Sequence, residues 1–360
     1  MLSLRNITLT QYKNYLEKSF SFDKPIIGIY GNNGVGKTNL LDAIYYLSFT
    51  RSYFYKSDLQ NVHHGKSGFR IEGNFETDTA DQKVVCILRE TGKKEVLLND
   101  EIYQRLSGHI GKFPCVIITP DDARIITEGS DERRRYTDAL LCQMDIQYLQ
   151  HLIEYNRLLQ QRNQLLRSLA ERISTDRSLL DVYDAQMLRP GTYIFVKRQH
   201  FFREVLPIIE SIYQYIAGTG DGLQLAYQSD LLLTPYAELL HKSRDKDLIL
   251  QRTHAGIHRD DLEILLKNQA FKNIASQGQR KSLLFALKLA EYEMLKISKG
   301  FAPIILLDDV FEKLDALRMH QLLARVCAPG NGQLFITDTH PERIKNHLDA
   351  LAADYSLIGL

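Results

Sequence analysis

The chain has 360 residues, of which 44% are hydrophobic, so it is long enough for two domains with a sizeable core and is not a disordered protein. Its 45 Lys and Arg residues balance its 44 Asp and Glu residues, so a polyanionic partner would have to meet a local basic patch. The N-terminus alternates like a strand and no run of about 18 apolar residues occurs, which excludes a signal peptide and a membrane span.

The four cysteines also bear on the class of protein. They are far apart in the sequence and form no C-x-x-C pair. We expect Cys86, Cys115, Cys142 and Cys327 to be reduced core residues, which suits a cytoplasmic protein.

Short apolar segments at both ends of the chain predict β-strands. The predicted strands cover 26–30, 68–75, 84–90, 95–99, 115–119, 262–267, 303–309 and 333–337. The middle differs, because apolar residues recur at threes and fours from about Glu132 to Ala217 and predict helices. A polar break at 174–178 predicts a turn, and Pro190 predicts a kink or a boundary near Arg189. The fold expected is an α/β body built from both termini, with an antiparallel helix-pair insertion.

A phosphate-binding loop follows the first internal strand. The letters GNNGVGKT match G-x-x-x-x-G-K-[ST], between the strand 26–30 and an amphipathic helix. Glycines let consecutive backbone N–H groups turn toward phosphate oxygens. We expect Lys37 to contact the β- and γ-phosphates and Thr38 to bind Mg²⁺. The predicted nucleotide contacts are Gly31, Asn32, Asn33, Gly34, Val35, Gly36, Lys37, Thr38 and Asn39.

Two carboxylates follow a buried strand near the other end of the chain. In PIILLDD, residues 304–307 are all apolar, and Asp308 and Asp309 come at the carboxyl end, where open α/β sheets bind ligands. Asp308 suits the orientation of Mg²⁺, and Asp309 suits the polarisation of the attacking water. Because aspartate is one methylene shorter than glutamate, we hypothesise slow hydrolysis, so that ATP acts as a timer.

The turn Ser276-Gln277-Gly278-Gln279 begins a long helix over 280–297. The order of turn, helix, buried strand and acidic pair is that of ATP-binding-cassette (ABC) ATPases, whose signature turn it resembles. The resemblance implies that Ser276, Gly278 and Gln279 cap ATP bound to a second copy in an isologous dimer. The alternative is that Ser276 is an ordinary helix N-cap.

Two further segments follow the acidic pair. In such ATPases a loop crosses the dimer axis at the position of 312–315, which makes Asp315 a predicted contact between subunits. The strand 333–337 ends where a γ-phosphate sensor belongs, and Asp338, Thr339 and His340 remain alternatives for it. His340 before Pro341 is equally compatible with a helix start facing water.

Basic residues offer a surface for a phosphate backbone without sequence readout. The predicted DNA contacts are Arg51, Lys56, Lys93, Lys94, Lys112, Arg133 and Arg134. The alternative for ERRRY at 132–136 is a solvated or internally paired face, with one arginine bound to acidic neighbours such as Asp121 or Asp122.

Taken together, these segments resemble the RecF family, bacterial recombination-repair ATPases related to the heads of SMC proteins. The resemblance rests on the segments 11–15, 31–52, 119–141, 160–166, 253–262 and 275–291. The chain departs from the usual pattern at Ile257, at Asp131 and at Lys313. The first two replace prolines, and Lys313 stands where an acidic residue is common.

The resemblance implies domains over 1–128, 129–250 and 251–360, the first and last forming one P-loop ABC-type head. It also implies a cytoplasmic, ATP- and Mg²⁺-dependent homodimer that binds gapped duplex DNA and promotes RecA loading with RecO and RecR. An SMC-like structural clamp and an ABC transporter subunit remain as alternatives. The insertion is short and irregular for sustained coiled-coil heptads, and a transporter subunit should lack an inserted helix pair.

Overall fold

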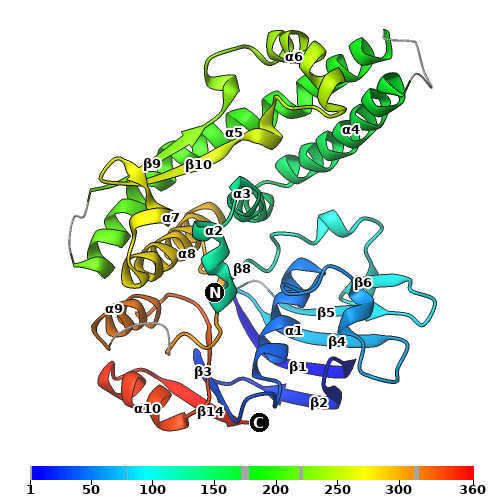
Figure 1. Ribbon diagram of the computed structural model, residues 1–360. Helices are drawn as coiled ribbons and strands as arrows, with labels where there is room; N and C mark the ends of the chain where they lie inside the picture. The colour runs from blue at the N-terminus through cyan, green and yellow to red at the C-terminus, as the bar shows by residue number, and fades with distance from the viewer. Residues whose placement is uncertain (1, 79, 172–177, 219–221, 312–315) are drawn as a thin grey trace. The chain divides into compact units, whose positions relative to one another are not determined.

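The computed structural model describes residues 2–78, 80–171, 178–218, 222–311 and 316–360. The chain forms two compact units: unit 1 contains Met1–Ala123, Ile212–Thr219 and Ser276–Leu360, and unit 2 contains Arg124–Ser211 and Gly220–Ala275. Both termini lie in unit 1, so unit 2 is inserted into it (Figure 1). The predicted α/β body with a helical insertion is confirmed.

A five-stranded parallel sheet in unit 1 has the strand order β14-β3-β13-β12-β8. Its strands are β3 (Ile26–Tyr30), β8 (Cys115–Ile118), β12 (Ile304–Leu307), β13 (Leu334–Asp338) and β14 (Tyr355–Gly359). All four residues of β12 are buried, as expected of a central parallel strand covered on both faces. Because the strands are parallel, the loops after β3, β12 and β13 leave from the same edge of the sheet.

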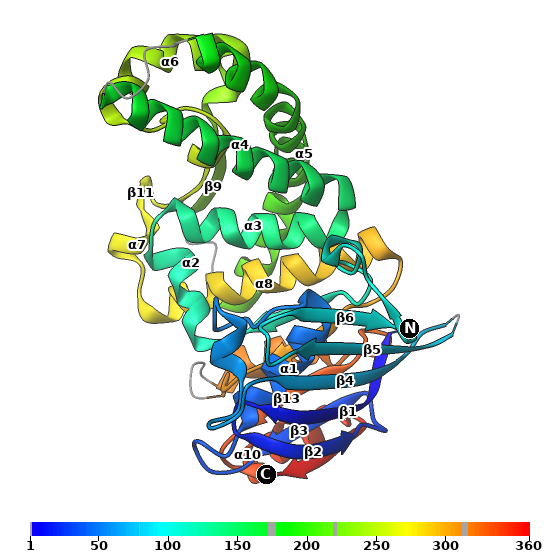
Figure 2. The same ribbon diagram turned by 90° about the vertical axis from the view of Figure 1, so that its right-hand side faces the viewer.

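The second sheet of unit 1 is antiparallel, with strand order β2-β1-β4-β5-β6-β7. Its strands are β1 (Ser3–Tyr12), β2 (Tyr15–Ser21), β4 (Phe69–Glu76), β5 (Asp81–Leu88), β6 (Lys94–Leu98) and β7 (Glu101–Ile102). Buried residues alternate along β4, so this sheet buries one face. Helix α1 (Lys37–Phe49) contacts strands of both sheets and lies between them (Figure 2).

Three other helices cover the parallel sheet of unit 1. Helix α8 (Gln277–Lys299) packs on β8, α10 (Pro341–Ala350) packs on β3 and β13, and α9 (Ala316–Val326) contacts α10. Short 3₁₀ helices η1 (Asp58–Asn61), η2 (Leu106–Gly108) and η3 (Pro120–Ala123) occur in the connections.

Unit 2 is mainly helical, with a small antiparallel sheet in the order β11-β10-β9. Its elements are α2 (Arg124–Thr127), α3 (Ser130–Met144), α4 (Ile146–Ala170), α5 (Ser178–Ala217), β9 (Leu223–Gln228), η4 (Asp230–Leu232), α6 (Tyr236–Leu250), η5 (Ile257–Arg259), β10 (Asp261–Leu266), β11 (Gln269–Ala270) and α7 (Phe271–Ile274). The last turns of α5, from Ile212, belong to unit 1. Residues 148 and 162 of α4 bond to residues 198 and 184 of α5. The two helices are therefore antiparallel, as predicted.

The limits of the units differ from the predicted boundaries after residues 128 and 250. Unit 2 begins at Arg124, and it ends at Ala275 because β10 pairs with β9 within unit 2. The strand at 262–267, which was expected in the second half of the head, therefore belongs to the insertion. Residues 212–219, which were expected in the insertion, belong to unit 1.

Helix α5 continues through Pro190, so the predicted boundary near Arg189 is absent. Pro190 is buried, and a Cβ atom on Gly191 would lie 2.3 Å from the ring of Tyr236. Tyr236 of α6 thus packs closely on this glycine, and the helix continues although proline removes a backbone donor. The predicted turn at 174–178 falls largely on 172–177, outside the described residues.

The cysteines are buried as predicted at positions 86, 115 and 142, whereas Cys327 is half-buried. None of the four forms a disulfide. Among the described residues, no helix combines the length and apolar character that a membrane crossing requires.

Candidate nucleotide site

The loop between β3 and α1 adopts backbone conformations that its glycines make possible. Gly31, Gly34 and Gly36 have φ values of +154°, +85° and +119°, in a region that L side chains rarely adopt. Helix α1 has neither an acidic residue in its first turn nor a side-chain cap. Its first backbone N–H groups therefore suit an anion such as a phosphate.

Lys37 lies across this loop rather than in solvent. Its side chain donates to the backbone carbonyls of Gly31 at 2.8 Å and Asn32 at 3.1 Å, and the residue is 5% exposed. These are the carbonyls of the loop that would surround a phosphate. A bound triphosphate would offer this ammonium group stronger, charged acceptors in the same place.

The turn between β1 and β2 holds the loop from the other side. Asn14 donates its amide to the carbonyl of Val35 at 2.8 Å, and the Tyr15 hydroxyl donates to the carbonyl of Gly36 at 3.0 Å. Asn39 in turn donates to the Asn14 carbonyl oxygen at 2.7 Å. Sequence reasoning used this segment only as a family resemblance and missed its contacts, because nothing local to 11–15 indicates a partner at 35–39.

Thr38 and Asp308 meet at the edge of the parallel sheet. The Thr38 hydroxyl lies 3.0 Å from each carboxylate oxygen of Asp308. Thr337, at the end of β13, donates to Asp308 Oδ1 at 2.9 Å. Burial raises the pKa of Asp308 to about 6, and Asp309 adds to this, while the hydrogen bonds from Thr337 and Thr38 and the charge of Lys37 oppose it.

The donor set at this edge fits Mg²⁺, which prefers oxygen ligands from one or two side chains together with phosphates. The Thr38 hydroxyl and the Asp308 carboxylate are the two side chains predicted to hold it, and they are in hydrogen-bond contact. A triphosphate on the loop would supply the remaining oxygens.

Asp309 has a left-handed backbone conformation, with φ of +46°. Its backbone N–H donates to the Thr337 hydroxyl at 3.0 Å. Thr337 therefore holds both acidic residues, accepting from one and donating to the other. Sequence reasoning missed Thr337 and considered only the three residues after it, although a threonine at the end of a buried strand was an available signal.

Ser276 is the N-cap of α8. Its hydroxyl accepts from the backbone N–H of Gln279 at 3.2 Å, and the Gln279 side chain accepts from the Ser276 N–H at 2.8 Å, which completes a capping box. Ser276 is exposed, and the first turn of α8 carries no acidic residue. Ser276 thus has the geometry of an ordinary helix N-cap, as one of the two alternatives predicted.

The three residues 338–340, at the end of β13 and just after it, differ in exposure. Asp338 is 2% exposed and accepts from the backbone N–H of His340 at 2.7 Å and from Arg343 at 3.2 Å. The His340 side chain is 65% exposed, and its ring Nδ1 lies 2.7 Å from the Thr339 hydroxyl. His340 is the N-cap residue of α10 without a side-chain cap. Asp315 lies outside the described residues.

The predicted basic DNA contacts fall into two groups. Arg51, Lys56 and Lys112 are exposed, and none of them has an ion pair with another described residue. By contrast, Lys93 and Lys94 pair with Glu95 and Asp58. Lys94 is also the more buried of these two lysines, since its side chain is 19% exposed.

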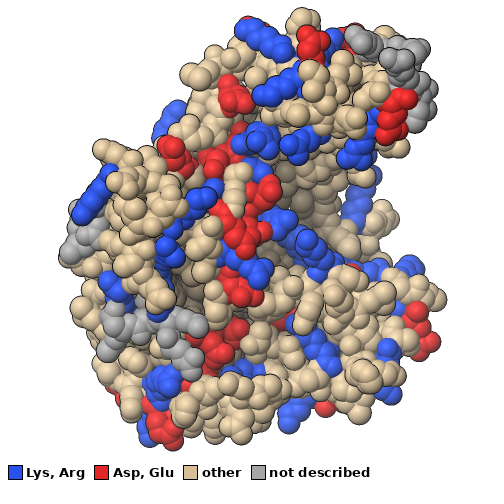
Figure 3. Space-filling model, viewed as in Figure 1, with Lys and Arg blue, Asp and Glu red and all other residues tan. Residues whose placement is uncertain are grey.

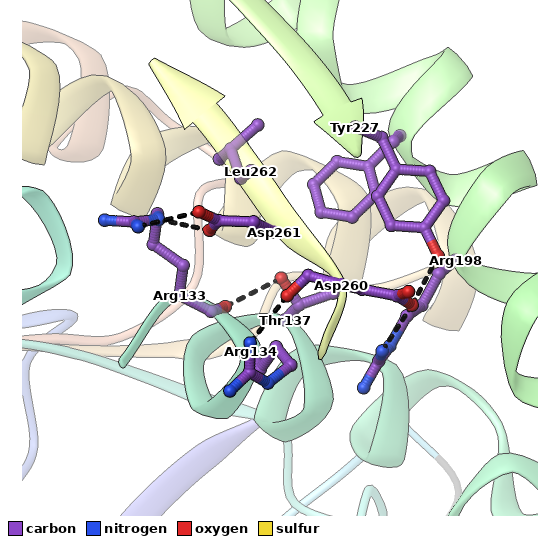
Figure 4. Close-up of a pocket in the computed structure, with 9 residues that line it drawn as sticks. Arg133, Arg134, Thr137, Arg198, Tyr227, Asp260, Asp261 and Leu262 are labelled. Atoms are coloured by element: carbon purple, nitrogen blue, oxygen red, sulfur yellow. Dashed lines mark hydrogen bonds and ion pairs between the residues drawn. The ribbon is translucent and has the colours of Figure 1, made fainter. Parts of the chain in front are cut away.

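Arg133 and Arg134 are held inside unit 2, around a small pocket with room for about one water molecule (Figure 4). Arg133 binds the Asp261 carboxylate at 2.6 Å and 2.9 Å, and Arg134 donates to the carbonyl of Asp260 at 2.6 Å. Their partners are therefore Asp260, Asp261 and, for Arg134, also Asp131, rather than the expected Asp121 or Asp122. The partners differ because β10 packs on α3, which the sequence did not indicate.

Comparisons with known proteins agree with this geometry. A family model described as the RecF/RecN/SMC N terminal domain matches residues 3–355. The DNA replication and repair protein RecF of Flavobacterium johnsoniae is 40% identical over 359 residues, which cover 100% of each chain. The protein of that name from Cytophaga hutchinsonii is 38% identical, with 98% of this chain and 94% of the relative covered.

Solved structures are similar as well. The recombination mediator protein RecF-ATP in the RecFOR pathway has a TM-score of 0.87 and 29% identity, with 94% of this chain and 92% of that chain covered. The RecF-ATPrS structure has a TM-score of 0.87, with 28% identity and 95% and 94% covered. An Smc head domain derived from Pyrococcus furiosus has a TM-score of 0.56 at 16% identity, covering 100% of this chain and 93% of that one, which supports the fold alone.

The fold and the loop at its sheet edge define a P-loop head of the ABC and SMC type with a helical insertion. Within that class, the chain belongs to the RecF family.

Proposed function

We propose that this protein binds ATP and Mg²⁺ at the loop 31–38 and uses the nucleotide to control its binding to DNA in replication and recombinational repair. The observation that carries the proposal is the contact of Thr38 with Asp308 beside a glycine loop of the required conformation. Relatives of nearly the same length are named DNA replication and repair proteins, and the solved RecF structures carry ATP in their names.

Hydrolysis would serve to reset the protein. Asp308 orients the metal ion, Lys37 neutralises phosphate charge, and Asp309, placed by Thr337, polarises the attacking water. His340, the exposed one of the three candidates at 338–340, is the γ-phosphate sensor in this proposal. We expect turnover well below about 10 s⁻¹, the median for enzymes.

The nucleotide would also join two copies. An exposed serine at a helix N-terminus without acidic residues is suited to the γ-phosphate of ATP held by a partner copy, with Gly278 allowing close approach. Asp315 would add a contact across the dimer axis. The proposed partners of the dimer are gapped duplex DNA and the RecO and RecR proteins, which together promote RecA loading in the cytoplasm.

Sedimentation tests the dimer. The mass is measured with a non-hydrolysable ATP analogue or ADP, with and without gapped duplex, for the wild type, Ser276→Arg and Ser298→Arg. Ser298 is an exposed serine on the last turn of the same helix and serves as the matched control. We expect the analogue to double the mass of the wild type and the control, while Ser276→Arg binds the analogue as a monomer. A wild type that binds the analogue and stays monomeric on DNA contradicts the sandwich.

For DNA, the exposed cations of unit 1 are the better-supported contacts. On the face shown in Figure 3, basic side chains are interleaved with acidic ones, so the DNA surface must be a local one. We expect Arg51→Glu with Lys56→Glu to weaken binding to all duplex sequences alike. The dependence of log affinity on log salt should flatten by about 0.9 for each DNA phosphate that the variant no longer neutralises. Lys93→Glu, at a lysine already paired with Glu95, is the control. If the dependence of log affinity on log salt is unchanged in the double variant, DNA binds to another surface of the protein.

A further inference from the structure

Helix α8 carries the turn 276–279 at its N-terminus and a buried pair of charges in its middle. Lys288 and Glu291 have side chains that are 5% and 7% exposed, and their charged atoms lie 3.4 Å apart. Lys288 follows Ser276 on the same helix by roughly 18 Å along its axis, at about 1.5 Å per residue. Burying charges is costly unless they are paired, so the position of α8 depends on the partners that Lys288 finds.

Asp122 in η3 is a partner of Lys288 outside the helix. The Lys288 ammonium lies 3.8 Å from Asp122 Oδ1, and the Asp122 side chain is 4% exposed. Asp122 is itself fixed, because its Oδ2 accepts from the backbone N–H of Thr119 at 2.7 Å and from the Thr119 hydroxyl at 3.3 Å. Thr119 directly follows β8, the strand beside β12, which leads to Asp308.

Tyr53 connects Asp122 to the phosphate-loop helix. Its hydroxyl donates to Asp122, and the Lys288 ammonium lies 5.9 Å from the centre of its ring. The backbone N–H of Tyr53 donates at 2.7 Å to Asp42, a fully buried residue of α1. Asp42 also accepts from Tyr12 and Ser52, each at 2.7 Å, and pairs with Lys13 at 2.6 Å.

These contacts form a continuous path from α1 through Tyr53, which is partly buried, and the buried Asp122 and Lys288 to α8, all within unit 1. Apolar packing alone would also hold α8 on β8, but it is non-directional and allows a helix to turn or slide. Hydrogen bonds and ion pairs fix direction and register. Stability alone does not require two buried carboxylates beside one lysine, since apolar residues of similar volume often give a folded protein of equal stability.

We infer that Tyr53, Asp122 and Lys288 are positioning residues that fix the turn 276–279 relative to the phosphate loop of the same chain. The inference rests on the proposed function, because the turn is taken to meet ATP held by a second copy. The three side chains act through α8 and contact no nucleotide themselves.

The test separates nucleotide binding from dimer formation. Lys288→Met removes the charge at similar length, and Tyr53→Phe removes only the hydroxyl and keeps the ring. Each variant is measured for ADP affinity as a monomer and for the dimer dissociation constant with the non-hydrolysable ATP analogue. We expect ADP affinity within twofold of the wild type and a dimer at least tenfold weaker. Lys296→Met, on the same helix where Lys296 donates to Asn331 at 2.7 Å, should change neither quantity.

The outcomes are distinct. If the wild type forms the dimer and both variants match it, the positioning role is wrong while the proposed function stands. If ADP affinity falls together with dimer strength, the residues serve the fold of the head as a whole, and the inference is again wrong. If the wild type fails to dimerise, the proposed sandwich is wrong, and the positioning role for the turn fails with it. Should Lys288→Met not fold, Tyr53→Phe alone decides, because it removes one hydrogen bond and leaves the packing intact.

Discussion

The hydroxyl of Thr38 lies 3.0 Å from both carboxylate oxygens of Asp308, although the two residues are 270 positions apart in the chain. The contact joins the start of α1 to the end of β12, at the edge where the parallel strands end. It places the two predicted Mg²⁺ ligands in hydrogen-bond contact. The remaining geometry of the site follows from the same edge, since Thr337 reaches Asp308 from the next strand.

Asp308→Asn should separate binding from hydrolysis. The amide keeps the size and can still accept from Thr38, but it removes the negative charge that orients the metal ion. We expect hydrolysis to fall by about 100-fold or more, as for the loss of one electrostatic group of an active site. Nucleotide binding without Mg²⁺, measured with a fluorescent ATP analogue, should change by less than about threefold. Hydrolysis at the wild-type rate would remove Asp308 from the reaction.

Gly36→Ala should disrupt the phosphate loop. A Cβ atom there would lie 2.6 Å from the Asn14 amide and 2.7 Å from the Tyr15 hydroxyl, at a φ of +119°. We expect ATP affinity to fall at least tenfold in a titration with the fluorescent analogue. Gly65→Ala is the control, because Gly65 has a φ of +78° with nothing within 4 Å of the added carbon. The Gly65→Ala variant has the same kind of backbone strain but no steric clash with a neighbouring side chain. If both variants lowered ATP affinity equally, the contacts of the β1–β2 turn with the phosphate loop would have no role in binding.

Arg162→Met should destabilise unit 2. Arg162 is fully buried on α4 and donates to Asp184 at 2.7 Å and to Asp247 at 2.6 Å. Its removal takes a buried cation from both carboxylates, of which Asp184 keeps its ion pair with Arg244 and Asp247 keeps its contact with His254. Breaking such a pair typically costs about 3–5 kcal/mol. We expect hydrogen exchange in α4, α5 and α6 to accelerate strongly. Arg157→Met, at an exposed position of the same helix, should leave exchange nearly unchanged, and similar behaviour of both variants would show that the buried network is not needed.

Glu291→Gln should change the dependence of stability on pH. Burial raises the pKa of Glu291 from 4.5 to about 6. The charge of Lys288 lowers this pKa and the charge of Asp122 raises it further. Tyr53 and Tyr45 lie in the same region. Because the folded protein holds this proton more tightly than the unfolded chain, the stabilisation present below pH 4.5 disappears as the pH rises through 6. This decrease amounts to about 2 kcal/mol.

The matching measurement is the thermal midpoint of the wild type and the variant at pH 5 and pH 7.5. Glu291→Gln should gain stability relative to the wild type at the higher pH, because it carries no charge to bury. The control is Glu293→Gln, because Glu293 lies on the same helix and forms a half-exposed ion pair with Arg325. A difference between wild type and Glu291→Gln that is the same at both pH values would contradict a buried, titrating Glu291.

Much of the candidate site was predictable because its signals are local. The glycine spacing of 31–36, the apolar strand before Asp308 and the Ser276–Gln279 capping box each depend on residues a few positions apart. Strand β3, strand β12 and helix α8 were therefore expected at nearly their observed limits. The helix pair of the insertion was predicted for the same reason, from the recurrence of apolar residues at threes and fours.

Features that depend on distant partners were missed. Strands β2, β9 and β14 lack a strong pattern of their own and gain their order by pairing with β1, β10 and β3. The pairing of β9 with β10 also moved the limit of the insertion to Ala275. Pro190 was expected to mark a kink or a boundary, and helix α5 continues through it without a boundary.

The phosphate loop, the acidic pair and the helix that begins at Ser276 could be predicted, because backbone conformation and capping depend on neighbours along the chain. Which side chains face one another depends instead on how the elements pack in the fold. Asp42 meets Tyr53, Asp122 meets Lys288, and Arg133 meets Asp261 because sheets and helices bring them together from distant positions. A buried charge must find a partner in the fold, and the spacing of residues along the chain does not specify which one.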